Sequence, residues 1–217
     1  MSSAQQLVDE LARKREQNPV PNALLDVAKS DRLTQDHMRG LVRTELQCHH
    51  TEVPSYGKML SRFPHRPAAD FYIELIDLLH SCGPKLEEAA EELGLPREKK
   101  DEWMWPADRR TYSYNGTMSW ITAQGNQAAT ALAVHTDMVV YFPGCTEIAA
   151  LIREQDVDAP ESFLSYYEGD PCEETRRRAI EVVQDGLDRG DDPREAVLMA
   201  RLLEESFRDF WASAAAA

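Results

Sequence analysis

Apolar residues recur three and four positions apart through most of this chain, whereas strict alternation of apolar and polar residues is rare. The first pattern is typical of amphipathic helices and the second of strands. The clearest stripe lies near the C-terminus, behind an Asp-Pro pair at 192–193 that suits a helix start, and consists of Met199, Leu203, Phe207 and Trp211. The sequence therefore predicts an all-α fold.

Similar stripes and cap residues predict seven or eight helices in all. They are expected over residues 34–60, 67–83, 85–95, 112–140, 146–154, 170–187 and 192–211. The helix over 112–140 is the least polar and must be central, and Pro143 and Gly144 are expected to end it. Between these helices, residues 99–110 are expected to form a loop whose Trp103 and Trp105 pack back on the domain.

Length and composition restrict the class of protein. The 217 residues, 42% of them hydrophobic, suit one domain over residues 1–213, followed by a short tail at 214–217. A net charge of −14 would repel a phosphate backbone, so no nucleic-acid partner is expected. The chain has no signal-peptide pattern and no long apolar run, so we expect no membrane association and a cytoplasmic location.

The four cysteines are far apart in the sequence and form no Cys-x-x-Cys pair. Neither a zinc site nor a disulfide framework is therefore indicated. We expect free thiols in a reducing compartment at all four positions, which are Cys48, Cys82, Cys145 and Cys172.

Asp137 is out of place in the expected central helix, because it stands between Val134 and the valine pair at 139–140. A buried ionised carboxylate is destabilising unless it is paired or coordinated. Two interpretations remain open. Asp137 either belongs to a local helix start, where Thr136 could also serve as a cap, or is a functional carboxylate.

Two further groups of polar residues have helical spacing. Glu45 and His49 lie four apart, as an acid–base or metal-binding pair would require, although exposed partners on one helix face have the same spacing. Glu74, Asp77 and His80 follow at three-residue steps among apolar residues. They form either the polar face of that helix or part of a site.

Several segments together resemble the TenA (thiaminase II) family. The stretch from Tyr112-Ser113-Tyr114 to Tyr141 is similar, without a gap, to a family segment that begins Tyr-Ser-Tyr and ends Cys-x-x-x-Tyr. Residues 167–170 resemble its Tyr-Gly-Gly-Asp segment, residues 210–211 its closing Phe-Trp pair, and residues 32–45 its early helix. The resemblance implies a heme-oxygenase-like helical bundle that forms a homodimer or homotetramer.

In that family a cysteine attacks a thiamin-like pyrimidine, a carboxylate handles protons and tyrosines orient the ring. Carried over by position, the resemblance assigns the cysteine to Asp137 and the carboxylate to Glu45, and the orienting groups to Tyr114, Tyr141 and Tyr167. Tyr112, Cys48, Phe207 and Glu204 fall at or near positions expected to bind substrate.

The change from cysteine to Asp137 alters the expected chemistry. A thiolate attacks a heteroaromatic carbon, whereas a carboxylate serves better as a base or a ligand. Thiamin hydrolysis is therefore not expected, and Cys145, beyond the expected helix break, is not expected to replace the nucleophile. The favoured hypothesis is a small-molecule enzyme, with no certain cofactor, that acts on a small heteroaromatic or amino-acid-derived metabolite through Asp137 and Glu45.

Two alternatives remain. The first is an iron or manganese site like that of the diiron oxidases of the same superfamily, although both histidines of their last ligand segment are missing here. A further branch, the PqqC-like oxidases, uses no metal and relies on His and Tyr around an organic substrate. Candidate ligands for such a metal are Glu45, His49, Glu74, His80, Asp137, Asp170 and Glu173, of which Asp170 also suits a helix cap. The other alternative is a non-catalytic ligand-binding or regulatory homologue, which a pocket filled by Phe207 and Trp211 would favour.

Overall fold

The computed structural model describes residues 3–169 and 172–216, and within these ranges it contains ten α-helices, two 3-10 helices and no strand. The α-helices are α1 (Ala4–Gln17), α2 (Ala23–Lys29), α3 (Gln35–Arg62), α4 (Ala68–Glu92), α5 (Lys100–Trp103), α6 (Ser113–Gln124), α7 (Gln127–Glu154), α8 (Glu161–Tyr167), α9 (Glu173–Asp188) and α10 (Pro193–Ala214). The 3-10 helices are η1 (Arg97–Lys99) and η2 (Arg109–Tyr112). The all-α prediction is confirmed, while the expected seven or eight helices were too few.

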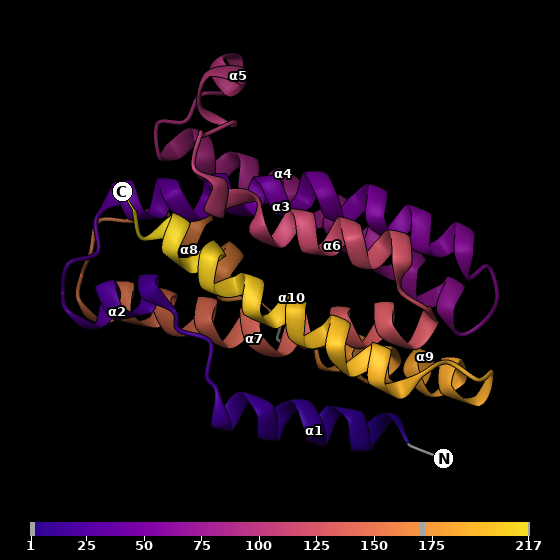
Figure 1. Cartoon of the computed structure of the whole chain (residues 1–217). Coiled ribbons are helices and arrows are strands. Elements are labelled where there is room, and N and C mark those ends of the chain that lie inside the picture. The colour runs from indigo at the N-terminus through magenta and orange to yellow at the C-terminus, as the bar shows by residue number, and fades with distance from the viewer. Residues whose placement is uncertain (1–2, 170–171, 217) are drawn as a thin grey trace.

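The helices form a bundle in which α3, α4 and α6 lie along one side and α7 and α9 along the other (Figure 1). The C-terminal helix α10 crosses in front of both groups and packs against α3, α6 and α7. On the outside, α1 lies against α9 and α10. None of the helices in the described part of the chain is long and apolar enough to cross a membrane.

Prolines inside helices account for most of the misplaced boundaries. Helix α4 continues through Pro84, so the two helices expected over 67–83 and 85–95 are one. Helix α7 likewise continues through Pro143, which we expected to end it. An interior proline costs about 3 kcal/mol of helix stability. Burial of Cys145, Ile148 and Ile152 beyond Pro143 offsets this cost and keeps the last turns of α7 in the core.

The expected central helix over 112–140 is divided at Gly125. A side chain there would lie 2.8 Å from the Ile121 carbonyl oxygen and 2.9 Å from the Met199 sulfur, so only glycine fits. Asn126 then caps α7 by accepting a hydrogen bond from the Ala129 amide at 2.8 Å. The following residues, 128–134, are all fully buried, which confirms that this helix is central.

Three smaller expectations have different outcomes. Thr34 and Asp192 precede α3 and α10 as expected, and the Asp192 carboxylate accepts from the Arg194 amide at 2.9 Å. Asp170, an expected cap, lies outside the described residues, and α9 begins at Glu173. The Trp103 indole packs against the core, although α5 projects from the bundle (Figure 1). The Trp105 ring is 57% exposed and contacts only the His50 ring among the described aromatic pairs, so the expectation that it packs on the domain was wrong.

Gly40 lets α3 and α10 approach closely, because an added Cβ would lie 2.7 Å from the backbone oxygen of Ala214. We expect Gly40→Ala to destabilise the protein by about 1–3 kcal/mol, since backbone of α10 would have to move. Gly57→Ala on the same helix meets nothing within 4 Å and is the matched control, expected to be neutral or stabilising by up to ~1 kcal/mol. Urea unfolding of both variants checks this, and equal effects would contradict it.

Candidate active site

A cavity of about 210 Å³ lies inside the bundle, enclosed by α3, α4, α6, α7, α8 and α10. Its wall contains carboxyl, hydroxyl, thiol and imidazole groups among apolar side chains. The expected site residues that line it are Glu45, Cys48, His49, Tyr114, Asp137, Tyr141, Tyr167 and Phe207. Residues from distant parts of the sequence therefore meet in one place.

Helix α3 supplies one face of the cavity through Glu45, His49, Glu52 and Tyr56. These residues lie four, three and four positions apart, which is the spacing of one helix face. Sequence reasoning found the first two and missed Glu52, which is only 7% exposed. The missed signal was the continuation of the Glu45–His49 spacing by one more turn.

The three carboxyl groups in the cavity have pKa values well above their ordinary range. Burial, and then the nearby Glu52, raises the pKa of Glu45 to about 8. Burial raises the pKa of Glu52 to about 7, against the lowering effect of hydrogen bonds from Tyr114 and Tyr56. Burial and the charges of Glu52 and Glu45 hold the pKa of Asp137 well above its usual range. Near neutral pH the site therefore contains protonated carboxylic acids.

Tyrosine hydroxyls connect these acids to a histidine. Tyr114 donates a hydrogen bond to Glu52 Oε1 at 2.6 Å. The Tyr166 hydroxyl lies 3.4 Å from Glu45 Oε1 and 2.9 Å from His49 Nε2. Burial, and then His50, lowers the pKa of His49 to about 4, so its imidazole is neutral. Glu45, Tyr166 and His49 thus form a chain along which a proton can move.

Two other tyrosine hydroxyls, those of Tyr141 and Tyr167, are buried without a hydrogen bond of normal geometry to any described residue. The Tyr141 hydroxyl nevertheless lies close enough to Glu45 and Cys145 to act against the rise in the pKa of both groups. Tyr141 is held by ring contacts with Phe207, Phe210 and Trp211, the last nearly parallel to it. A buried polar group without a partner is costly, so these two hydroxyls are well placed to bind a ligand. The ring cluster leaves the cavity open and does not fill it.

All four cysteines line the cavity, although they are far apart in the sequence. Because α7 continues through Pro143, Cys145 lies on the cavity side of that helix, and the expected helix break, from which we argued against a role for Cys145, is absent. Burial raises the pKa of Cys48 and Cys145 well above the usual range and that of Cys82 to about 11. These three are therefore thiols near neutral pH and poor nucleophiles.

Several predicted site residues do not line the cavity. The Tyr112 hydroxyl donates to the Pro106 carbonyl at 2.8 Å, and Glu204 is buried on α10 beside Arg15 and Arg201. His80 and Glu173 are exposed. They lie on helix faces that point away from the cavity, which sequence spacing alone could not show. Asp170 is outside the described residues.

The candidate metal ligands do not fit an iron or manganese site. Within residues 3–169 and 172–216, no three His, Cys, Asp or Glu side chains are grouped so that they could hold a metal ion. Glu74 accepts a hydrogen bond from Thr175 at 2.9 Å and is paired with Arg178.

Comparisons with known proteins bear on the fold alone. No family model and no curated protein sequence matches this chain significantly. The structure is similar to the X-ray structure of a TenA homologue from Pyrococcus furiosus, with a TM-score of 0.71 and 16% sequence identity, covering 96% of this chain and 99% of that chain. This chain therefore has the TenA-like, heme-oxygenase-like all-α fold.

Proposed function

We propose that the chain is an enzyme that moves protons on a small organic molecule bound in the central cavity. The observation that carries this proposal is the convergence of Glu45, Glu52 and Asp137 from α3 and α7 on one enclosed space. Three carboxyl groups in one cavity, two of them buried and Asp137 half-buried, destabilise a fold, and perturbed pKa values of this kind are typical of catalytic sites.

The protonation states suit acid–base catalysis. A group is most effective as an acid or base when its pKa lies near the working pH. Glu45 and Glu52, with pKa values of about 8 and 7, can each release and regain a proton under neutral conditions. Tyr166 and His49 provide a route for the proton that Glu45 exchanges, and the buried hydroxyls of Tyr141 and Tyr167, which lack hydrogen bonds of normal geometry, can orient the substrate.

The proposed reaction class follows from Asp137. It stands where the resemblance to the TenA family places the nucleophilic cysteine, and burial holds the pKa of its carboxyl group well above the ordinary value, which favours the protonated acid over a nucleophilic carboxylate. We therefore propose proton transfer to and from a small heteroaromatic or amino-acid-derived metabolite, without covalent attack by a thiolate.

Asp137→Asn is expected to lower turnover about a hundredfold or more, because the amide keeps the shape of the side chain but cannot exchange a proton. Activity can be followed without knowing the substrate, by mass spectrometry of a metabolite extract incubated with the protein. Compounds that the original protein consumes should persist with the variant.

The matched control is Asp77→Asn, which makes the same substitution at an exposed position of α4. This variant should consume those compounds at the original rate. Full activity of Asp137→Asn would contradict the proposal. If the original protein retains a small molecule and never converts it, the non-catalytic alternative is favoured instead.

A further inference from the structure

Helix α7 presents two hydrogen-bond donors to the central cavity. Asp137 and Tyr141 lie four residues apart, so both project from one side of this helix, and both line the cavity. The Tyr141 hydroxyl is buried without a hydrogen bond of normal geometry to any described residue. Burial and the nearby carboxyl groups hold the pKa of Asp137 well above its ordinary value, which favours the protonated form. Since a protonated carboxyl group donates through its O–H, this wall offers two donors to a ligand.

Helix α3 presents a carboxyl group of a different kind from the other side of the bundle (Figure 1). Glu52 accepts a hydrogen bond from the Tyr114 hydroxyl at 2.6 Å, and the Tyr56 hydroxyl donates to it as well. Both bonds stabilise the ionised form, so they act against burial, and the pKa of Glu52 is about 7. Among the described residues, no hydrogen bond has this effect on Asp137. Near neutral pH, Glu52 is therefore better suited to act as a base and Asp137 as an acid.

The rest of the cavity wall favours an uncharged ligand. It is largely apolar and includes Leu79, Met138 and Phe210. Among the described residues that line the cavity, Lys85 is the single lysine or arginine, and it is exposed on α4. A carboxylate deep in the cavity would therefore lose its hydration with no cation beside it. A carbonyl oxygen fits better, because it is uncharged and has two lone pairs, one for each of the two donors on α7.

We propose that the cavity binds a small neutral carbonyl compound and converts it to its enol, with the carbonyl oxygen at Asp137 and Tyr141 and the adjacent C–H group facing Glu52. This inference rests on the proposed function and names its substrate class. The Glu52 carboxylate takes a proton from the carbon next to the carbonyl, and the electron pair of that C–H bond forms a C=C bond. The C=O π pair moves onto oxygen, which takes the Asp137 proton while the Tyr141 hydroxyl stabilises the developing charge. Return of the Glu52 proton to carbon, and of the enol proton to Asp137, restores both groups.

The test is hydrogen–deuterium exchange of three ketones, which are cyclopentanone, cyclohexanone and acetophenone. Each is incubated with the protein in D2O near neutral pD, and proton NMR follows the loss of signal at the carbons next to the carbonyl. With at least one ketone, the protein should exchange these hydrogens about a hundredfold faster than the Glu52→Gln variant, which lacks the base. Tyr141→Phe keeps the ring but removes one donor to the oxygen, so it should lower the rate about a hundredfold.

Tyr112→Phe is the matched control, because the Tyr112 hydroxyl donates to the Pro106 carbonyl and does not line the cavity, and it should exchange at the original rate. The inference is overturned if no ketone exchanges faster with the protein than with Glu52→Gln, or if Tyr141→Phe exchanges as fast as Tyr112→Phe. The metabolite assay with Asp137→Asn separates this failure from that of the proposed function. Consumption that depends on Asp137 without ketone exchange overturns the substrate class alone, whereas consumption that Asp137→Asn leaves unchanged overturns both.

Discussion

Glu45→Gln is expected to raise the free energy of unfolding by about 3–5 kcal/mol near pH 8 and to change it little near pH 4.5. The folded protein holds the Glu45 proton up to a pKa of about 8, whereas the ordinary value is 4.5. The stability that this proton contributes is fully present below pH 4.5 and is lost as the pH rises to about 8. The glutamine side chain has no proton to lose, so the variant escapes this loss.

Urea unfolding followed by circular dichroism at several pH values measures the effect. Glu88→Gln is the matched control, because Glu88 is exposed on α4 and does not line the cavity. It should give curves that superimpose on those of the original protein. A Glu45→Gln variant that is destabilised by the same amount at every pH would show that Glu45 is ionised in the folded protein.

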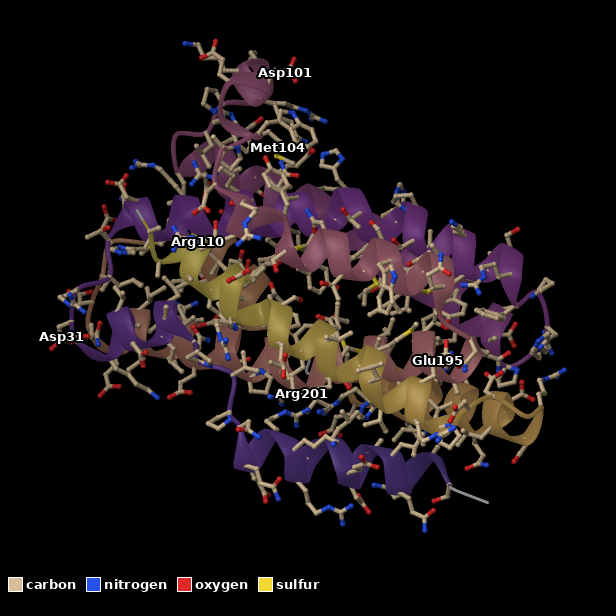
Figure 2. The ribbon with its side chains drawn as sticks, in the orientation of Figure 1. Asp31, Asp101, Met104, Arg110, Glu195 and Arg201 are labelled. Carbon is tan, nitrogen blue, oxygen red and sulfur yellow. The ribbon has the colours of Figure 1, made fainter. Side chains whose placement is uncertain are left out.

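Glu204→Ala is expected to lower the free energy of unfolding by about 3–5 kcal/mol. Glu204 is fully buried, and its Oε1 lies 2.8 Å from Arg15 Nε and 3.1 Å from Arg201 Nη1. Arg201 lies on the side of α10 that faces α1 (Figure 2) and also donates to the Asn18 carbonyl at 2.7 Å. Removal of the carboxylate leaves the guanidinium groups of Arg15 and Arg201 without their shared ion-pair partner and weakens the attachment of α1 to α10.

Glu205→Ala provides the comparison, since Glu205 is exposed and pairs with the same Arg201 at 2.9 Å. An exposed pair contributes about 0–1 kcal/mol, so this variant should unfold almost like the original protein. Limited proteolysis should release α1 more readily from the Glu204→Ala variant. Equal stability of the two variants would contradict a structural role for Glu204.

The residues that the sequence revealed most clearly are those that conflict with their surroundings. Asp137 lies among apolar residues in the least polar stretch of the chain, and this conflict is visible without coordinates. Glu45 was found through the helical spacing of its neighbours together with the resemblance to the TenA family. Both line the cavity.

The errors in the predicted helices concern prolines inside helices and helices that are too short to show a periodic pattern of apolar residues. A proline inside a helix costs stability locally, and only the burial of the turns beyond it decides whether the helix continues. That burial is a property of the whole bundle, so Pro84 and Pro143 were misjudged as helix ends. Short α2 and α8 have too few turns to show a clear period.

The errors in the site concern the direction in which side chains point. His80, Glu173 and Glu204 have residue types that suit catalysis or metal binding, yet each lies on a helix face turned away from the cavity. Successive residues of a helix point in directions that differ by about 100°. Which face points inward depends on the packing of neighbouring helices, which spacing within one helix cannot show.

The central claim is that burial in the cavity raises the pKa of three carboxyl groups well above their ordinary values, and carbon-13 NMR titration of the aspartate and glutamate carboxyl carbons tests it most directly. We predict carboxyl resonances that titrate near pH 7 and near pH 8 and that disappear in Glu52→Gln and Glu45→Gln respectively, while Asp137 stays protonated well above its ordinary pKa of 3.8. Titration of every carboxyl group below about pH 5.5 would contradict the claim, because the site would then consist of ionised carboxylates.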